Sequence, residues 1–299
     1  MNKKNNSKLE LVETDKTSEV DKLSKTLKHL SVTTTLKPLV KWSGGKSDEI
    51  SLFEKYLPSP KDYDTYIEPF IGAGALYFHL NYQCKEKLNV INDVHTELIH
   101  FYKTIKYDYV NYVYNFMQRN PNDEETYYKV RGMTIDDFVD DASRFYYLRK
   151  TCFRGMLRYN SSGEFNIPFG RYKTINYDNL LNNEYVKLLK NTKIYSKDFE
   201  VIFKKYNNER NFMFLDPPYD SEFTDYGYCT FDKKDHKRLA KYFKKTKNKC
   251  LMIIGKTEFI EDLYENYIID EYDKQYKFKL YSGRIGNEIN NKHLIIKNY

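Results

Sequence analysis

One segment of the sequence places a carboxylate and an aromatic ring on a stiff loop: residues 213–219 read Met-Phe-Leu-Asp-Pro-Pro-Tyr. The apolar residues are typical of a buried strand, and two prolines end a strand and restrict the backbone that follows. Open α/β sheets bind ligands at the carboxyl ends of their strands. There, Asp216 and the carbonyl of Pro217 can accept hydrogen bonds from an exocyclic amino group, and Tyr219 can stack on the ring that carries it. The same pattern also fits an ordinary turn, so other parts of the chain must support the interpretation.

A glycine pair and a distant acid indicate a nucleoside-containing cofactor. Gly72 and Gly74 follow Phe70 at the start of a helical pattern, and glycine lets the backbone approach a ligand closely. Asp93 follows at a spacing of roughly twenty residues, where a carboxylate can accept both hydroxyls of a ribose. Nicotinamide dinucleotide and S-adenosylmethionine both contain adenosine. Because Leu76 and Tyr77 follow in place of a third glycine for a pyrophosphate, the pattern favours S-adenosylmethionine.

The segment Lys-Trp-Ser-Gly-Gly-Lys at residues 41–46 holds the only tryptophan of the chain. Trp42 could be a core residue and Lys46 a solvated charge. Beside a nucleoside site, however, the Gly-Gly turn can bring Trp42 against the cofactor and Lys46 to the cofactor carboxylate.

Residues 144–173 are rich in positive charge and in aromatic rings. They contain seven basic residues, eight aromatic residues and a single acid, Glu164. Cations bind phosphates, and arginine can also donate two hydrogen bonds to guanine. A solvated basic loop is the alternative, but so many aromatic rings need a surface to pack against. We therefore expect this segment to contact nucleic acid, with Arg171 on a phosphate.

The composition excludes several classes of protein. The chain has 49 basic and 42 acidic residues, a net charge of +7 that says little by itself. No apolar run approaches the roughly 18 residues of a membrane span, and no secretory signal is seen, so we expect a cytoplasmic or DNA-associated intracellular protein that is not secreted. The four cysteines are scattered without a metal-binding spacing, and we expect no metal site.

Strand and helix patterns alternate at both ends of the chain, around a helical middle. Strands are expected near 66–68, 88–91, 192–195, 212–215, 251–254 and 268–272, with a final pair near 276–282 and 293–298; helical patterns cover 95–150 and 234–244. We expect an α/β catalytic domain formed by residues 37–95 and 192–299, interrupted by a domain over residues 96–191. Residues 1–36 are expected to form a flexible polar tail.

The order of these motifs resembles the Dam family of DNA adenine-N6 methyltransferases, the D12 class. Lys-Trp-Ser-Gly-Gly-Lys, Glu-Pro-Phe-Ile-Gly-Ala-Gly and Asp-Pro-Pro-Tyr appear in the family order, with a DNA-reading segment at residues 152–172 between the last two. The last residues, Leu294–Tyr299, are similar to the final strand of the family. The resemblance covers Leu36 to Tyr299.

This resemblance implies a fold, a cofactor and a set of contacts. The fold is a Rossmann-like mixed-sheet class I methyltransferase domain with an inserted, mostly helical DNA-recognition domain. S-adenosylmethionine would contact Trp42, Lys46, Asp93 and Asp216. In duplex DNA, Phe153 would insert into the base stack, Arg158 would contact a guanine and Lys41 would contact the first guanine of GATC. The remaining expected DNA contacts are Arg154, Met156, Asn160, Pro168 and Tyr172.

The expected reaction is attack of the adenine N6 nitrogen on the cofactor methyl group. Because N6 is hidden in duplex DNA, the base must flip out, with Tyr219 as its stacking surface. No step requires a metal. Two alternatives stay open: an RNA or other amino-group methyltransferase with the same loop, and a DNA-binding protein without activity. The sequence indicates no obligatory protein partner, and a cognate restriction endonuclease acting on the same site is one possible partner.

Overall fold

The structure is a computed structural model that describes residues 35–42, 44–80, 85–220, 230–275 and 290–299. The chain divides into two units, Met1–Thr35 and Leu36–Tyr299, and the second contains the sheet and the helices discussed below. Most of the expected polar tail, the expected strand near 276–282, and two of the four cysteines, Cys84 and Cys229, lie outside the described residues.

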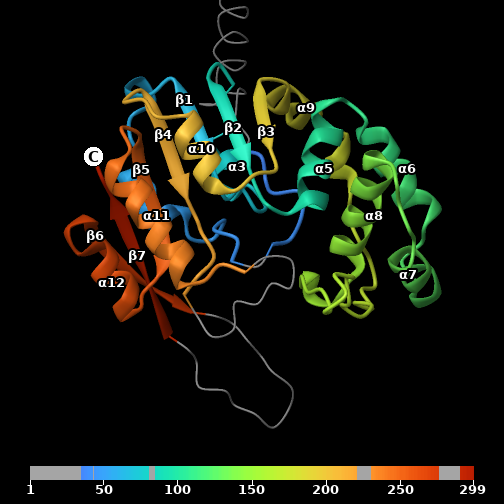
Figure 1. The fold of residues 1–299 in the computed structure, drawn as a ribbon. Helices are drawn as coiled ribbons and strands as arrows, with labels where there is room; N and C mark the ends of the chain where they lie inside the picture. The colour runs from blue at the N-terminus through green and yellow to red at the C-terminus, as the bar shows by residue number, and fades with distance from the viewer. Residues whose placement is uncertain (1–34, 43, 81–84, 221–229, 276–289) are drawn as a thin grey trace, which may run out of the picture. The chain divides into compact units, whose positions relative to one another are not determined.

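The described residues form a seven-stranded mixed α/β sheet with the strand order β3-β2-β1-β4-β5-β7-β6 (Figure 1). The strands are β1 (Thr65–Glu68), β2 (Leu88–Asn92), β3 (Thr192–Tyr195), β4 (Asn211–Leu215), β5 (Lys249–Gly255), β6 (Ile268–Gln275) and β7 (Asn290–Lys297). Strands β1 to β5 are parallel, whereas β7 runs antiparallel to both of its neighbours, β5 and β6. This arrangement confirms the Rossmann-like mixed sheet.

The chain reverses its direction of travel across the sheet beside β1. From β1 it passes to β2 and β3 on one side, and it then returns to place β4 and β5 on the other side. Thr65 of β1 therefore pairs with Leu88 of β2 and with Asn211 of β4. Connections that leave in opposite directions open a crevice at the carboxyl ends of such strands, where open α/β sheets bind ligands.

Alternate residues of the central strands enter two separate cores, one on each face of the sheet. In β4, Phe212 and Phe214 face one core, whereas Met213 and Leu215 face the other. All five residues of β4 are buried, as expected for a parallel strand covered on both faces.

The core that contains Met213 and Leu215 is covered by α10 (Phe199–Lys205), α11 (Lys233–Lys245) and α12 (Glu258–Tyr264), which lie in front of the sheet in Figure 1.

The other helices of the described chain are α2 (Ile50–Phe53), α3 (Ala75–His79), α5 (Thr96–Lys106), α6 (Val110–Arg119), α7 (Glu124–Arg131), α8 (Phe138–Thr151) and α9 (Asn183–Lys190). Polar side chains cap most of them; Asp232 and Asp235 form a reciprocal capping box that begins α11. None of the helices in the described part of the chain is long and apolar enough to cross a membrane.

Helices α5 to α8 occupy the segment between β2 and β3, which confirms the helical pattern expected over residues 95–150. Helix α8 packs against α5 and α6, and Phe101 stacks on Tyr146 with ring centroids 5.0 Å apart. Between α8 and residue 178 the chain has a short 3₁₀ turn, Phe153–Gly155, and two isolated antiparallel bridges.

Candidate active site

A cavity opens at the carboxyl ends of β1, β2 and β4, and the motifs expected from the sequence meet there. The loop after β1, the end of β2, the loop after β4 and the segment before α2 all contribute to its wall. Every residue expected to bind cofactor or to act in catalysis lines this cavity: Trp42, Lys46, Phe70, Gly72, Gly74, Asp93, Asp216, Pro217 and Tyr219.

The centre of the cavity wall is an ion pair between Lys46 and Asp216. Lys46 Nζ lies 2.8 Å from Asp216 Oδ1 and donates a 2.7 Å hydrogen bond to the carbonyl of Gly44. Burial raises the pKa of Asp216, and the charge of Lys46 opposes that rise. Lys46 is 1 % exposed and also faces the ring of Tyr219 at 5.1 Å. Nζ also lies 2.9 Å from Asp216 Oδ2, so the three donors of the ammonium group are directed at Gly44 and at both oxygens of Asp216.

Asp93 is held by the glycine loop itself. Its Oδ2 accepts a 3.0 Å hydrogen bond from the amide of Gly72, and its Oδ1 accepts one of 3.0 Å from the amide of His95. Burial raises the pKa of Asp93 to about 6, and these backbone bonds limit the rise. The carboxylate is therefore fixed in direction, and each oxygen keeps a lone pair for a further donor.

Gly72 is required by its conformation and by a close contact. Its φ is 46°, and a Cβ added there would lie 2.9 Å from Cδ1 of Trp42. Trp42 therefore packs directly on the turn that follows β1. The indole also meets the edge of His95, with ring centroids 5.3 Å apart. The side chain of Trp42 thus forms part of the cavity wall beside the glycine loop.

A second buried carboxyl group, Glu68 at the end of β1, also lines the cavity. Burial is the main reason that its pKa rises to about 8, and the nearby charge of Asp216 raises it further. Glu68 is bonded to the hydroxyl of Tyr66. Its raised pKa favours the protonated form at neutral pH, which reduces the negative charge on β1 beside Asp216.

Sequence reasoning missed a buried network behind the ion pair. Glu49 is 2 % exposed and binds His293 Nδ1 at 2.7 Å, the Tyr272 hydroxyl at 2.7 Å and Lys274 Nζ at 2.6 Å. His293 meets Tyr219 edge-on, with ring centroids 5.2 Å apart. The network thus connects β6 and β7 to the catalytic loop. Glu49 lies three residues after Lys46, but nothing in the local sequence indicates its partners on the final strands.

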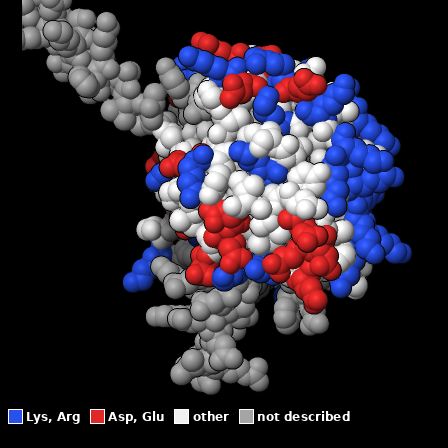
Figure 2. Space-filling model, turned by 90° about the vertical axis from the view of Figure 1, so that its left-hand side faces the viewer, with Lys and Arg blue, Asp and Glu red and all other residues white. Residues whose placement is uncertain are grey.

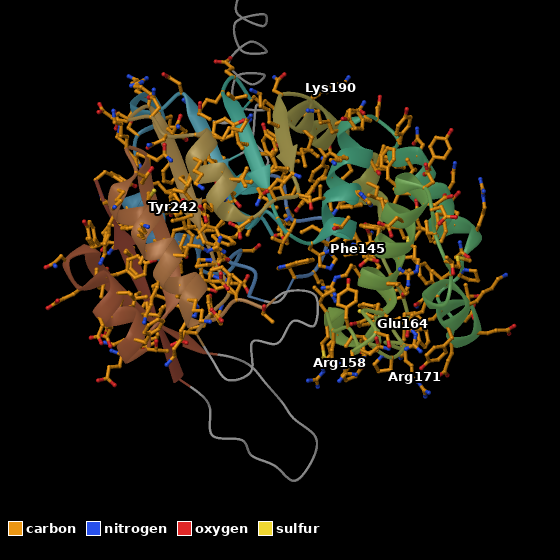
Figure 3. All side chains as sticks on the ribbon, viewed as in Figure 1. Phe145, Arg158, Glu164, Arg171, Lys190 and Tyr242 are labelled. Carbon is orange, nitrogen blue, oxygen red and sulfur yellow. The ribbon has the colours of Figure 1, made fainter. Side chains whose placement is uncertain are left out.

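The expected DNA contacts gather on a hairpin over residues 152–169. Antiparallel bridges join Cys152 to Phe169 and Tyr159 to Phe165, so its two arms run side by side. The buried Cys152 has no disulfide partner. Figure 3 shows Arg158, Glu164 and Arg171 together at the lower end of the helical region. Phe153, Arg154, Met156, Asn160 and Pro168 lie on the same hairpin, and Arg154, Met156 and Pro168 are exposed.

The two arginines at this end differ in their partners. Arg158 Nε donates a 2.8 Å hydrogen bond to Asn166 Oδ1, across the hairpin. Arg171 pairs with Glu124 at 3.2 Å, and both side chains are well exposed. Lys41, which precedes the cofactor motif, comes within 4.9 Å of the Tyr172 ring centroid. The structure therefore brings Lys41 to the 152–172 segment although about a hundred residues separate them in the chain.

Positive charge is not confined to the hairpin. Helix α11 exposes a row of lysines at helical spacing, Lys233, Lys237, Lys241, Lys244 and Lys245 among them. Figure 2 shows Lys and Arg side chains gathered along one edge of the face it presents, and acidic side chains gathered below the centre. Among the described residues, no three His, Cys, Asp or Glu side chains are grouped so as to hold a metal ion.

The chain is similar in sequence to known DNA methyltransferases. Residues 42–278 match the family described as D12 class N6 adenine-specific DNA methyltransferase. The chain is 58 % identical to the type II methyltransferase M.CviBI of Paramecium bursaria Chlorella virus NC1A, over 88 % of this chain and 100 % of that protein. It is 35 % identical to the type II methyltransferase M.MjaIII of Methanocaldococcus jannaschii, over 78 % and 90 %, and 28 % identical to a DNA adenine methylase of Haemophilus influenzae, over 76 % and 82 %.

Proposed function

Because the chain belongs to the D12 class of N6 adenine-specific DNA methyltransferases, we propose that it transfers the methyl group of S-adenosylmethionine to an adenine flipped out of duplex DNA, in GATC or a closely related site. The observation that carries the proposal is the Lys46–Asp216 ion pair, which lies in the same cavity as Asp93 and the glycine loop. A methyl donor and a reacting amine can meet in this cavity, because the motif residues expected to bind each of them line it together.

The residues around the cavity fit the parts of S-adenosylmethionine. Asp93 would accept the ribose hydroxyls, because its carboxylate is already directed by Gly72 and His95. Trp42, Phe70 and the backbone at Gly72 and Gly74 would enclose the adenosine, and the positive charge of Lys46 would attract the cofactor carboxylate. When bound, the cofactor supplies an electrophilic methyl group on a sulfonium centre.

Asp216, Pro217 and Tyr219 would prepare the adenine. Lys46 holds Asp216 in place, so its carboxylate can accept one N6 hydrogen while the Pro217 carbonyl accepts the other. These acceptors favour a pyramidal nitrogen whose lone pair is free to attack. In the products the methyl carbon would be bonded to N6, the cofactor would remain as S-adenosylhomocysteine, and the N6 proton would pass through the Asp216 carboxylate to solvent. Such fixed dipoles and positioning supply most of the rate enhancement in reactions of this kind.

The segment between β2 and β3 would form the DNA-recognition domain, over residues 96–191. Its hairpin would present Arg158 for a guanine and Phe153 for insertion, Arg171 just after the hairpin would bind a phosphate, and Lys41 would contribute from the catalytic side. The exposed Arg158 on one arm of the hairpin supports this assignment, since a guanidinium can reach into a major groove. Residues 1–36 are assigned no part in catalysis.

The test is transfer of tritiated methyl from S-adenosylmethionine to duplex DNA, beside single-stranded DNA and RNA of the same sequence. We expect duplex DNA to be labelled, and single-molecule sequencing to place N6-methyladenine in GATC or a close relative. Preferential labelling of RNA would favour the alternative amino-group methyltransferase. Binding of duplex DNA without any labelling would indicate a protein that has lost activity.

A cognate restriction endonuclease is a partner suggested by relatives that are named type II methyltransferases. If one acts on the same site, DNA modified by this enzyme should resist cleavage by it. Co-expression of the enzyme with a candidate nuclease, scored by cell survival, would test this part of the proposal separately from the chemistry.

A further inference from the structure

Arg149, near the end of α8, joins two segments that are far apart in the sequence. Its side chain is 1 % exposed. Nε donates a 3.2 Å hydrogen bond to the carbonyl of Lys41, Nη2 donates one of 2.6 Å to the carbonyl of Gly155, and Nη1 donates one of 2.5 Å to the carbonyl of Met156. One guanidinium therefore holds the segment before the cofactor motif against the turn that begins the hairpin.

The same guanidinium also faces the cofactor side of the cavity. Its Cζ lies 5.6 Å from the ring of Trp42, and Trp42 packs on Gly72 in the glycine loop. At the hairpin end, a Cβ added at Gly155 would lie 2.8 Å from Cδ of Lys41, so the two segments touch closely there. A continuous line of contacts thus leads from the glycine loop through Trp42 and Arg149 to the DNA-reading turn.

The chemistry of this contact requires arginine. A planar guanidinium has five donors in a fixed fork, so it can satisfy carbonyls that lie in different directions, whereas the point charge of lysine cannot match that geometry. A buried cation is costly unless its donors are satisfied. Any movement of the 41–42 segment or of the 155–156 turn would therefore disturb the other, because both share the same buried donor group.

We propose that Arg149 is a positioning residue that couples cofactor binding to recognition of the DNA target. When cofactor fixes Trp42, Arg149 fixes Lys41, Gly155 and Met156 in the geometry that contacts DNA, and bound DNA stabilises the cofactor side in return. The inference rests on the proposed function, since it assigns cofactor to one end of the line and DNA to the other.

The chain contains a single tryptophan, so the fluorescence of Trp42 reports directly on the cofactor site. We would titrate S-adenosylhomocysteine, the reaction product, with and without a duplex that carries the target site. Coupling between sites typically changes affinity by about 5- to 150-fold, and the change must be reciprocal. For the unmodified protein we expect at least a fivefold gain in product affinity with duplex, and the same gain in duplex affinity with product.

In R149K the affinity for S-adenosylhomocysteine with duplex should differ from the affinity without duplex by no more than about twofold, which is below the range of ordinary coupling. The matched control is R144K. Arg144 lies on the same helix and also binds carbonyls, at Val130 and Arg131, and it pairs with Glu97, but it touches neither the 41–42 segment nor the 155–156 turn. Its variant should keep the full coupling. A loss of packing alone would lower melting temperature without changing the ratio.

A second variant reaches the same junction from the other side. G155A introduces a Cβ at a φ of 61° against Lys41, with Arg149 intact, and it should also remove the coupling. If circular dichroism shows that R149K does not fold, G155A becomes the test of whether this junction couples the two sites. Full coupling in a folded R149K or G155A, or no coupling in the unmodified protein, would overturn the inference. If the unmodified protein bound no product, or labelled no DNA, the proposed function itself would fail.

Discussion

At the scale of single residues, Asp216 is the group on which the proposed chemistry would depend. Burial raises its pKa, and the ion pair with Lys46 opposes that rise. In the proposed reaction this carboxyl group would accept a hydrogen bond from an amine that loses a proton as it gains a methyl group.

Replacing Asp216 by alanine should reduce methyl transfer by roughly 10² or more, the scale of losing one preorganised polar contact. DNA binding should change little, because the residue faces the amine and not the phosphates. Tritium transfer and gel-shift assays measure the two effects. Asp220→Asn is the control: Asp220 bonds Thr257 at 2.9 Å and does not line the cavity. Near-normal turnover of the alanine variant would contradict the mechanism.

Asp93 should make cofactor affinity depend on pH. Burial raises its pKa from 3.8 to about 6, so the protein gains stability from its proton at low pH and loses that contribution as pH rises through about 6. Cofactor binding has the opposite dependence, because only the ionised form accepts two ribose hydroxyls. Below a pH of about 6 the affinity for the cofactor should fall about tenfold for each pH unit. Calorimetry on Asp93→Asn should give weaker binding without this pH dependence; an equal slope in both proteins would remove Asp93 from the site.

The position of Asp216 and of the glycine loop in the cavity could be predicted from the sequence, because each motif is local. Asp216 to Tyr219 and Gly72 to Gly74 follow apolar strands, and that pattern alone places them at one sheet edge. Glu49, His293 and Arg149 could not be predicted in the same way. Their roles arise from partners that lie more than a hundred positions away in some cases, and a single buried acid or arginine carries no signal of such a partner.

At the scale of elements, the hairpin over residues 152–169 and the residues just after it are proposed to make two kinds of DNA contact. Arg158→Ala should flatten the preference at one base pair, since an arginine–guanine pair contributes about 1–3 kcal/mol of discrimination. Arg171→Ala should weaken binding to all sequences alike and reduce the salt slope by about one contact. Binding to a set of single-base variants at several salt concentrations tests both. If the Arg171 variant changed the preference and the Arg158 variant did not, the two roles would have to be exchanged.

Glu49 should stabilise the junction of α2 with β6 and β7. Burial alone would raise its pKa, but the hydrogen bond from His293 and the charge of Lys46 lower it from 4.5 to about 2. The stabilisation is therefore present above pH 4.5 and disappears as pH falls through about 2. Glu49→Gln should cost about 3 kcal/mol at neutral pH, as breaking a buried ion pair does. Urea unfolding at neutral and acid pH measures this cost.

The control for Glu49 is Glu261→Gln, which removes a largely exposed ion pair with Lys256. That change should cost no more than about 1 kcal/mol at any pH. A Glu49 variant as stable as this control would show that the network contributes little to folding.

The strands and long helices could be predicted because their periodicity is strong and their ends are marked by proline, glycine or a capping acid. The seven- and eight-residue helices α9, α10 and α12 were not predicted. Each spans about two turns, too few for a helical period to stand out from the neighbouring loops. The position of β7 between β5 and β6 also could not be predicted, because local sequence does not indicate the order of strands in a sheet.

At the scale of the whole molecule, residues 36–299 contain every described part of the cavity and the hairpin. A protein that lacks residues 2–33 should therefore fold and should methylate short duplexes within a few-fold of the full chain, since a polar segment of this composition buries little apolar surface. Circular dichroism and initial rates test this. A truncated protein that failed to fold would show that the catalytic unit begins earlier in the chain.

The position of β7 has a consequence for synthesis of the protein. The ribosome releases β6 before β7, yet β7 must lie between β5 and β6. Until it arrives, the nascent chain has an unpaired apolar edge at β5, and such edges can pair with other chains. His293 arrives with β7, so its bond to Glu49 and its ring contact with Tyr219 form only at that late stage. Translation that stops before residue 290 should therefore give an aggregating chain and not a weakly active enzyme, which leaves the cell with no partly functional methylase from incomplete synthesis.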